Sequence, residues 1–291
     1  MWLHRWGMVQ TWPAARHALL VITLIMACAL SRTVRAEDLV IPGSGNPEYV
    51  LGVLAEAFNR QQSGHRVVIP PSTGTAGAIR DVEAMTADLG RLGRPLTDAE
   101  RARGLVYVPL GRDPVTFVAG AGVTVTGLTS RQVIDAFAGR ITDWQDLGGN
   151  PGPIRAIGRE MTDASRRAIN RVIAPFETIV FGESVKIVHL DPQMIALLDR
   201  FPTSLGFLNR SALGPAQTRL VHLTLDGVPA TADSVQMGRY PLWIEVGLIH
   251  KAGWPNPAAR AFIAFIRSAE GAAILRAEGL LGIPGQAGPR G

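Results

Sequence analysis

The chain has 291 residues, and 47% of them are hydrophobic, so a large buried core is available and disorder is excluded as the dominant state. Lysines and arginines number 29 against 24 acidic residues, but four arginines lie in the first 36 residues, which contain no acid. The rest of the chain is nearly neutral, which argues against a nucleic-acid-binding protein. The single cysteine, Cys28, excludes a disulfide framework and any cysteine-based zinc site.

The first 36 residues have the order of a signal peptide. Arg5 and Arg16 precede an uncharged apolar run from Ala18 to Leu30, and small residues lead up to Ala36. This run is shorter than the roughly 20 residues that a membrane-spanning helix needs. We therefore predict a signal peptide at residues 1–36 and a periplasmic protein. Two alternatives stay open, a lipid anchor on Cys28 and an uncleaved membrane anchor.

Residues 38–283 alternate between strand and helix patterns. Short apolar runs bounded by glycine or proline predict strands at 38–41, 67–69, 115–118, 154–157 and 185–188. Helical spacing predicts helices that include 51–58, 78–85, 166–173 and 257–277. Capping signals place further helix starts after Thr97, Thr129, Asp191 and Asn256. This alternation predicts an α/β fold.

Two of the predicted strands end in a turn rich in glycine and hydroxyl groups, directly before a helix. The first turn contains Ser44, Gly45 and Asn46, and the second contains Ser72, Thr73, Gly74 and Thr75. A helix N-terminus offers unpaired backbone N–H groups and a partial positive charge, so such turns suit an anion. A tight connection with an N-cap explains each turn as well. Neither turn has the lysine of a Walker loop or the glycine spacing of a dinucleotide-binding loop.

A third turn follows the strand that ends near Arg159. It contains Asp163, Ala164 and Ser165 and opens another predicted helix. Arginine offers an oxyanion a rigid fork of hydrogen-bond donors, although a surface ion pair is the other explanation for Arg159. Because three turns of one kind occur in one chain, we expect them to converge on a single anion.

Six stretches of the chain carry a pattern known from one protein family. In chain order they are IPGSGN, IPPSTGTAGAI, TADLGRLGRPLTDAE, SRQVIDAFAGRITDWQDLGGNPGPIRAIGRE, TSLGFLNRSAL and VHLTLDGVPATADSVQMGRYPL. The chain resembles the phosphate-binding protein of bacterial ABC importers, a type II periplasmic binding protein, over nearly all of residues 38–283.

The resemblance implies an α/β fold of two lobes, with mixed sheets flanked by helices and a two-strand hinge. We place one lobe at residues 37–113 and 224–291 and the other at 114–223. The resemblance also implies a protein that holds an inorganic oxyanion, most closely phosphate, between the lobes and delivers it to an ABC permease in the inner membrane. We expect a monomer that is not an enzyme and that uses no cofactor and no metal.

The ligand contacts of the family match this chain unevenly. Ser44 with Asn46 and Ser72 with Thr73 stand where the family has its first two turns, and Arg159 matches the family arginine. Where the family has Ser-Gly-Thr after that arginine, this chain has Asp163, Ala164 and Ser165. The family aspartate that accepts the proton of monohydrogen phosphate should fall near Gly93, and it is missing.

The missing aspartate matters because a buried hydroxyl without an acceptor costs about 1–3 kcal/mol. We hypothesise that Asp163 supplies the acceptor from the opposite lobe and that Arg94 adds positive charge where the acid is absent. The competing explanation is that Asp163 is simply the N-cap of the helix that follows it.

Two other classes of protein stay open. A hydrolase would need a nucleophile beside a base, but the surroundings of Ser44 lack the nucleophile-elbow pattern, and the six histidines show no triad or metal spacing. A module of the same fold that serves as a sensor or interaction partner, with altered or lost anion binding, is the main alternative.

Overall fold

The computed structural model describes residues 38–61, 64–253 and 256–282. The predicted signal peptide at 1–36 and its alternative, a lipid anchor at Cys28, lie outside the described residues. Within those three ranges, no helix is long and apolar enough to cross a membrane. Strands and helices alternate along most of the described chain, as the sequence predicts.

Within the described ranges, the strands form two sheets. In the small sheet, β1 (Asp38–Val40) pairs in parallel with β2 (Arg66–Val68). The larger sheet has eight strands in the order β3-β10-β4-β8-β6-β7, and β9 joins β5 to β4. Its strands are β3 (Gly90–Leu92), β4 (Leu105–Ala119), β5 (Gly127–Leu128), β6 (Arg155–Arg159), β7 (Lys186–Val188), β8 (Ser204–Asn209), β9 (Val221–Leu225) and β10 (Trp243–Lys251). Parallel and antiparallel pairs both occur, so the sheet is mixed, as predicted.

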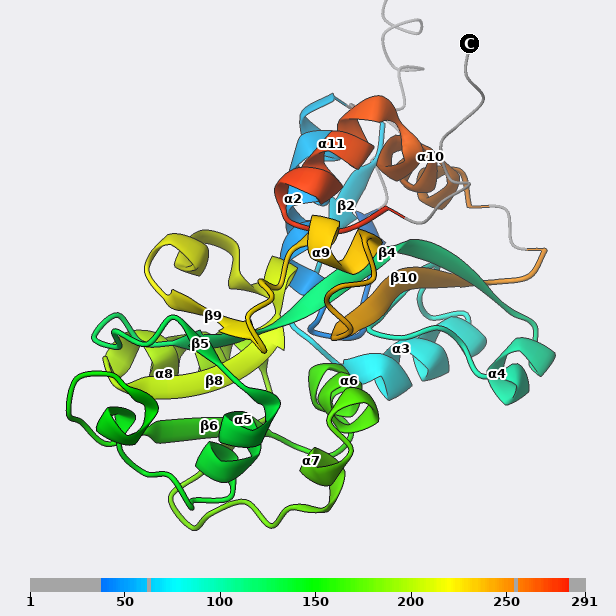
Figure 1. Ribbon diagram of the computed structural model, residues 1–291. Helices are drawn as coiled ribbons and strands as arrows, with labels where there is room; N and C mark the ends of the chain where they lie inside the picture. Colours follow the sequence, from blue (N-terminus) through cyan, green and yellow to red (C-terminus); the bar gives the residue numbers. More distant parts are fainter. Residues whose placement is uncertain (1–37, 62–63, 254–255, 283–291) are drawn as a thin grey trace, which may run out of the picture. The chain divides into compact units, whose positions relative to one another are not determined.

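The long strand β4 pairs with different strands along its length (Figure 1). Up to Pro114 it pairs with β10, and from Val115 onward it pairs with β8 and β9. The backbone N–H of Val115 donates to the carbonyl of Leu242 at 2.9 Å, directly before β10 begins. The chain therefore passes along β4 from the part of the fold that contains β10 to the part that contains β8, and it returns to the first part beside the same strand.

The helices begin where the capping signals place them in most cases. They are α2 (Glu48–Gln61), α3 (Gly74–Glu83), α4 (Asp98–Ala102), α5 (Ser130–Phe137), α6 (Ala164–Val172), α7 (Pro175–Thr178), α8 (Asp191–Arg200), α9 (Ala232–Gln236), α10 (Pro257–Arg267) and α11 (Ala269–Ala277), with 3-10 segments η1 (Trp144–Leu147) and η2 (Arg210–Thr218). The capping boxes at Thr97 and Thr129 and the N-cap at Asn256 are confirmed.

Two predicted helix boundaries are wrong. Asp191 is the first residue of α8 rather than its N-cap, because its side chain bonds to Arg159 instead of to the helix amides. The predicted last helix is two helices, because Ser268 is extended and its hydroxyl caps α11 by accepting from the N–H of Gly271.

Aromatic rings form two separate clusters in the core. Phe58 of α2 meets Phe262 and Phe265 of α10 edge to face. A second cluster of fully buried rings joins β4, α5, α7 and β8 through Phe117, Phe137, Phe176 and Phe207. Edge-to-face pairs of this kind fix the packing of a core. Leu39 of β1, Val67 of β2 and Ala156 of β6 belong to the same buried core, so the strands that precede the three turns are packed against it.

Candidate functional site

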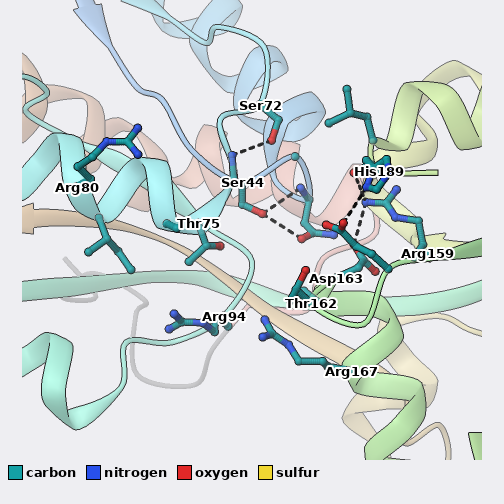
Figure 2. Close-up of a pocket in the computed structure, with 18 of the residues that line it drawn as sticks. Ser44, Ser72, Thr75, Arg80, Arg94, Arg159, Thr162, Asp163, Arg167 and His189 are labelled. Atoms are coloured by element: carbon teal, nitrogen blue, oxygen red, sulfur yellow. Dashed lines mark hydrogen bonds and ion pairs between the residues drawn. The ribbon is translucent and has the colours of Figure 1, made fainter. Parts of the chain in front are cut away.

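One cavity of about 890 Å³ lies where the three predicted turns meet. Ser44 and Ser72, from the first two turns, and Arg159, the last residue of the strand before the third turn, all line it (Figure 2). Of the predicted site residues, its lining includes Ser44, Gly45, Asn46, Ser72, Gly74, Thr75, Arg94, Arg159, Asp163 and Ala164. The volume is in the range of small-molecule sites. The expected convergence of the turns is therefore present.

The backbone of the first turn is held by a buried arginine that the sequence analysis did not single out. Arg91 of β3 is fully buried, and its Nε donates to the carbonyl of Ser44 at 2.8 Å. Its Nη2 donates to the Glu48 carboxylate at 2.8 Å and to the carbonyl of Pro70 at 2.7 Å, and its Nη1 donates to the carbonyl of Ile41. One guanidinium thus fixes the first turn and the approach to the second.

The side chains of the first turn connect it to the middle of β4. The Ser44 hydroxyl donates to Asn46 Oδ1 at 3.0 Å, and Asn46 Nδ2 donates to Asn209 Oδ1 at 2.9 Å. Asn209 Nδ2 in turn donates to Asp113 Oδ2 at 2.7 Å. Burial raises the pKa of Asp113 to about 6 in spite of its hydrogen bonds to Asn209 and Ser211.

The second turn is tied to the first through Ser72. Its hydroxyl donates to the carbonyl of Gly43 at 3.0 Å and accepts from the N–H of Gly74 at 3.2 Å. Gly74 has a φ of +73°, in the left-handed region that glycine adopts most easily, and α3 begins there. The N-terminus of α3, with Gly74 and Thr75, consequently lies at the cavity wall.

In the third turn, Arg159 is paired with two carboxylates. Its Nη1 donates to Asp191 Oδ1 at 2.7 Å, and its Nη2 donates to Asp163 Oδ2 at 2.8 Å. All three side chains are about 6% exposed or less. Asp163 Oδ1 also accepts from the N–H of Arg166 at 3.0 Å, so the N-cap explanation of Asp163 is confirmed. Arg159 therefore faces the cavity with its charge already compensated.

Asp191 is a second residue of this site that the sequence analysis did not assign to it. It lines the cavity, and the pKa of its carboxyl is raised to about 6 because burial disfavours the charged form more than Arg159 favours it. The available signal is the pair Asp191–Pro192, which predicts a helix start. Its contact with Arg159 spans 32 residues of sequence, and no local pattern reveals such a contact.

The predicted positive charge of Arg94 is balanced by an acid. Arg94 lines the cavity, but Nη1 and Nη2 donate to the two carboxylate oxygens of Glu100 at 2.8 and 2.7 Å. The hydrogen bond from Arg94 is the main reason that the pKa of Glu100 falls to about 2. At Gly93, a Cβ atom would lie 2.4 Å from Asn46 Oδ1, so the first turn fills the space in which an aspartate would begin.

Thr73 and Ser165 are not brought to the cavity wall. Thr73 packs its hydroxyl against Gly77, within the first turn of α3. Ser165 is 1% exposed because it points into the protein from the first turn of α6, and its Oγ has no hydrogen-bond partner. Among the described residues, no cluster of three or more histidine, cysteine or acidic side chains could hold a metal ion.

Comparisons with known proteins identify the family. The sequence matches the model of the PBP superfamily domain over residues 30–270. The phosphate-binding protein PstS of Borreliella burgdorferi is 20% identical over 249 residues, which cover 84% of this chain and 89% of that protein.

Solved structures agree with this match. One of them, from Clostridium perfringens, is described as a phosphate ABC transporter substrate-binding protein with bound phosphate. It is 25% identical to this chain and superposes with a TM-score of 0.75. The match covers 85% of this chain and all of that one. An ABC-type phosphate transport receptor from Vibrio cholerae has the same fold, with 22% identity, a TM-score of 0.62 and coverage of 84% and 100%. These matches confirm the prediction of a two-lobed α/β fold. They also confirm the prediction of a binding protein rather than an enzyme.

Proposed function

The chain belongs to the PBP superfamily, and we propose that it is an extracytoplasmic solute-binding protein that captures phosphate in the cavity of the three turns and delivers it to an ABC permease. The observation that carries the proposal is the convergence of Ser44, Ser72 and Arg159 on one cavity. Relatives named for phosphate binding support the choice of ligand.

The site would bind an oxyanion through backbone and side-chain donors together. The N-termini of α3 and α6 contribute amide groups and partial positive charge, while Ser44, Ser72 and Thr75 contribute hydroxyls. Arg94, Arg159 and Arg167 also line the cavity. Several charge-assisted hydrogen bonds of about 1.5–3 kcal/mol each are enough for micromolar affinity, which needs about 8 kcal/mol.

In this proposal the cavity lies between two lobes, residues 37–113 with 224–291 and residues 114–223. The cavity-lining residues of the first and second turns would then belong to the former lobe, and those of the third turn, with Asp191, to the latter. A ligand that contacts both lobes stabilises their closed arrangement, and a permease can distinguish the closed form from the open one. This proposal gives the protein a periplasmic location, with export directed by residues 1–36.

A sensor or interaction module without anion binding is the second candidate. It is favoured by one observation, the pairing of Arg159 with both Asp163 and Asp191, because two carboxylates beside the guanidinium weaken its attraction for an anion. Binding measurements separate the two candidates.

The test is thermal unfolding and calorimetric titration of the purified protein with phosphate, with chloride at matched ionic strength as the control. At a phosphate concentration 100 times Kd, binding to the folded state adds about 2.7 kcal/mol, which raises the midpoint by about 5–10 °C. Arg159→Gln should weaken phosphate binding at least tenfold. Arg155→Gln, at the exposed start of the same strand, should not weaken it. A midpoint unchanged by millimolar phosphate favours the module instead.

A further inference from the structure

The cavity continues beyond the three turns along one face of α3. Thr75, Ile79 and Glu83 all line it at four-residue spacing on that helix. Gly74 and Glu83 are the first and last residues of α3 on the wall, and the helix advances about 14 Å between them. We call this part of the cavity the extension, and its charged lining residues are Arg80, Glu83, Arg94, Glu100, Arg103 and Arg167. A single tetrahedral oxyanion held by the turns would leave the extension unused.

The two ends of the cavity differ in charge. At the turns, Arg159 is paired with both Asp163 and Asp191, so acids outnumber the arginine there. The extension has four arginines against two acids. Its excess of positive charge attracts an anionic group, whereas the turns alone offer a second negative charge little compensation.

Arg167 is the arginine of the extension that has no partner. Arg80, Arg94 and Arg103 each form an ion pair with an acid. The side chain of Arg167 has no hydrogen bond or ion pair with any residue that the structure describes, and it extends from α6 into the cavity toward Arg94 (Figure 2). Partial burial and, after it, the nearby charge of Arg94 lower the pKa of Arg167, which Asp163 only partly offsets. An anion bound beside the two arginines would remove this repulsion.

We propose that the cavity prefers a condensed phosphate, an anion of two or three linked phosphoryl groups, with one phosphoryl group at the three turns and the next beside Arg94 and Arg167. This inference rests on the proposed function and narrows its class of ligand. The fixed fork of donors in a guanidinium matches the oxygens of a phosphoryl group. A third phosphoryl group would lie farther along α3, toward Arg103.

The test is calorimetric titration of the purified protein at pH 7.5 and matched ionic strength, without divalent cations. The probes are inorganic phosphate, diphosphate and triphosphate, together with glycerol 3-phosphate. Wild type should bind diphosphate at least about tenfold more tightly than phosphate, because the second phosphoryl group gains charge-assisted hydrogen bonds. Glycerol 3-phosphate adds bulk without a second phosphoryl group, so it should bind no more tightly than phosphate.

Three variants locate the preference in the extension. Arg167→Gln should lower diphosphate affinity at least about tenfold and phosphate affinity by no more than about threefold. Glu83→Gln releases Arg103 from its acid and should raise triphosphate affinity about threefold, a gain that misfolding cannot produce. Arg101→Gln removes the same charge from an exposed position of α4 outside the cavity lining, and it should keep the wild-type ratio of affinities. Circular dichroism and the unfolding midpoint check that each variant folds.

The outcomes are distinguishable. If wild type binds none of these anions, the proposed function fails and this inference fails with it. If phosphate or glycerol 3-phosphate binds as tightly as diphosphate, the proposed function stands and this inference is overturned. If Arg167→Gln keeps the wild-type ratio of affinities, or if Arg101→Gln lowers that ratio equally, overall charge rather than the extension sets the preference, and the inference is again overturned.

Discussion

At the scale of single residues, we expect one glycine of the first turn, Gly45, to leave room for the proposed ligand. Gly45 stands between Ser72 and Asp191, and its backbone lies outside the left-handed region, so an alanine can adopt the same conformation. The contacts of the added Cβ, at 3.5 and 3.6 Å, are ordinary van der Waals contacts. The methyl group would nevertheless occupy the space between the two polar groups.

Gly45→Ala should therefore weaken phosphate binding at least tenfold while the unfolding midpoint without ligand changes by no more than about 2 °C. Titration calorimetry and thermal unfolding measure the two effects. Gly52→Ala, in α2, adds a methyl where nothing lies within 4 Å, and its affinity should equal that of wild type. Normal phosphate affinity in Gly45→Ala would place the ligand elsewhere in the cavity.

At the scale of elements, β3 positions the turns through Arg91. The guanidinium is fully buried and reaches Ile41, Ser44 and Pro70, which lie on both sides of α2 in the sequence. The planar fork of arginine makes these bonds simultaneously, whereas the single amine of lysine cannot.

Arg91→Lys should lower the free energy of unfolding by about 2 kcal/mol or more, because carbonyl groups are left without donors in a buried site. For a domain of this size, that corresponds to a midpoint about 4–8 °C lower. Phosphate affinity should fall as well, since the first turn loses its support. Arg131→Lys alters an exposed pair with Asp135 and should stay within about 0.5 kcal/mol of wild type. Equal midpoints for wild type and Arg91→Lys would show that β3 does not hold the turns.

Some of these elements and site residues could be predicted from the sequence alone, and others could not. The turns at Ser44 and Ser72 and the capping boxes at Thr97 and Thr129 could be predicted, because their signals lie within a few residues. Arg91 and Asp191 could not, since their partners Glu48 and Arg159 are 43 and 32 residues away. The local pattern at Asp191 predicts a helix cap because it carries no sign of the distant Arg159.

At the scale of the whole molecule, a buried polar network joins the first turn to the place where β4 changes partners. Asp113, which is fully buried, accepts hydrogen bonds from Asn209 at 2.7 Å and from the N–H of Ser211 at 3.1 Å. Asn209 also bonds to Asn46. An acid at this position makes the stability of the fold depend on pH.

Asp113→Asn should reduce the loss of stability that the wild type shows between pH 4 and pH 6. The folded-state pKa of Asp113 is raised to about 6 from 3.8, so in this range the folded protein keeps a proton that the unfolded chain releases. Stability from this acid is therefore full below about pH 4 and is lost as the pH rises through 6, by up to about 3 kcal/mol. The variant has no such proton to release. The difference between its unfolding midpoint and that of the wild type should therefore increase, in favour of the variant, by several degrees between pH 4.5 and pH 7. Thermal unfolding at both pH values measures this difference, and Asp199→Asn, at the surface, should show none. A constant difference across the pH range would mean that Asp113 remains ionised in the folded protein, with Asn209 and Ser211 compensating its burial.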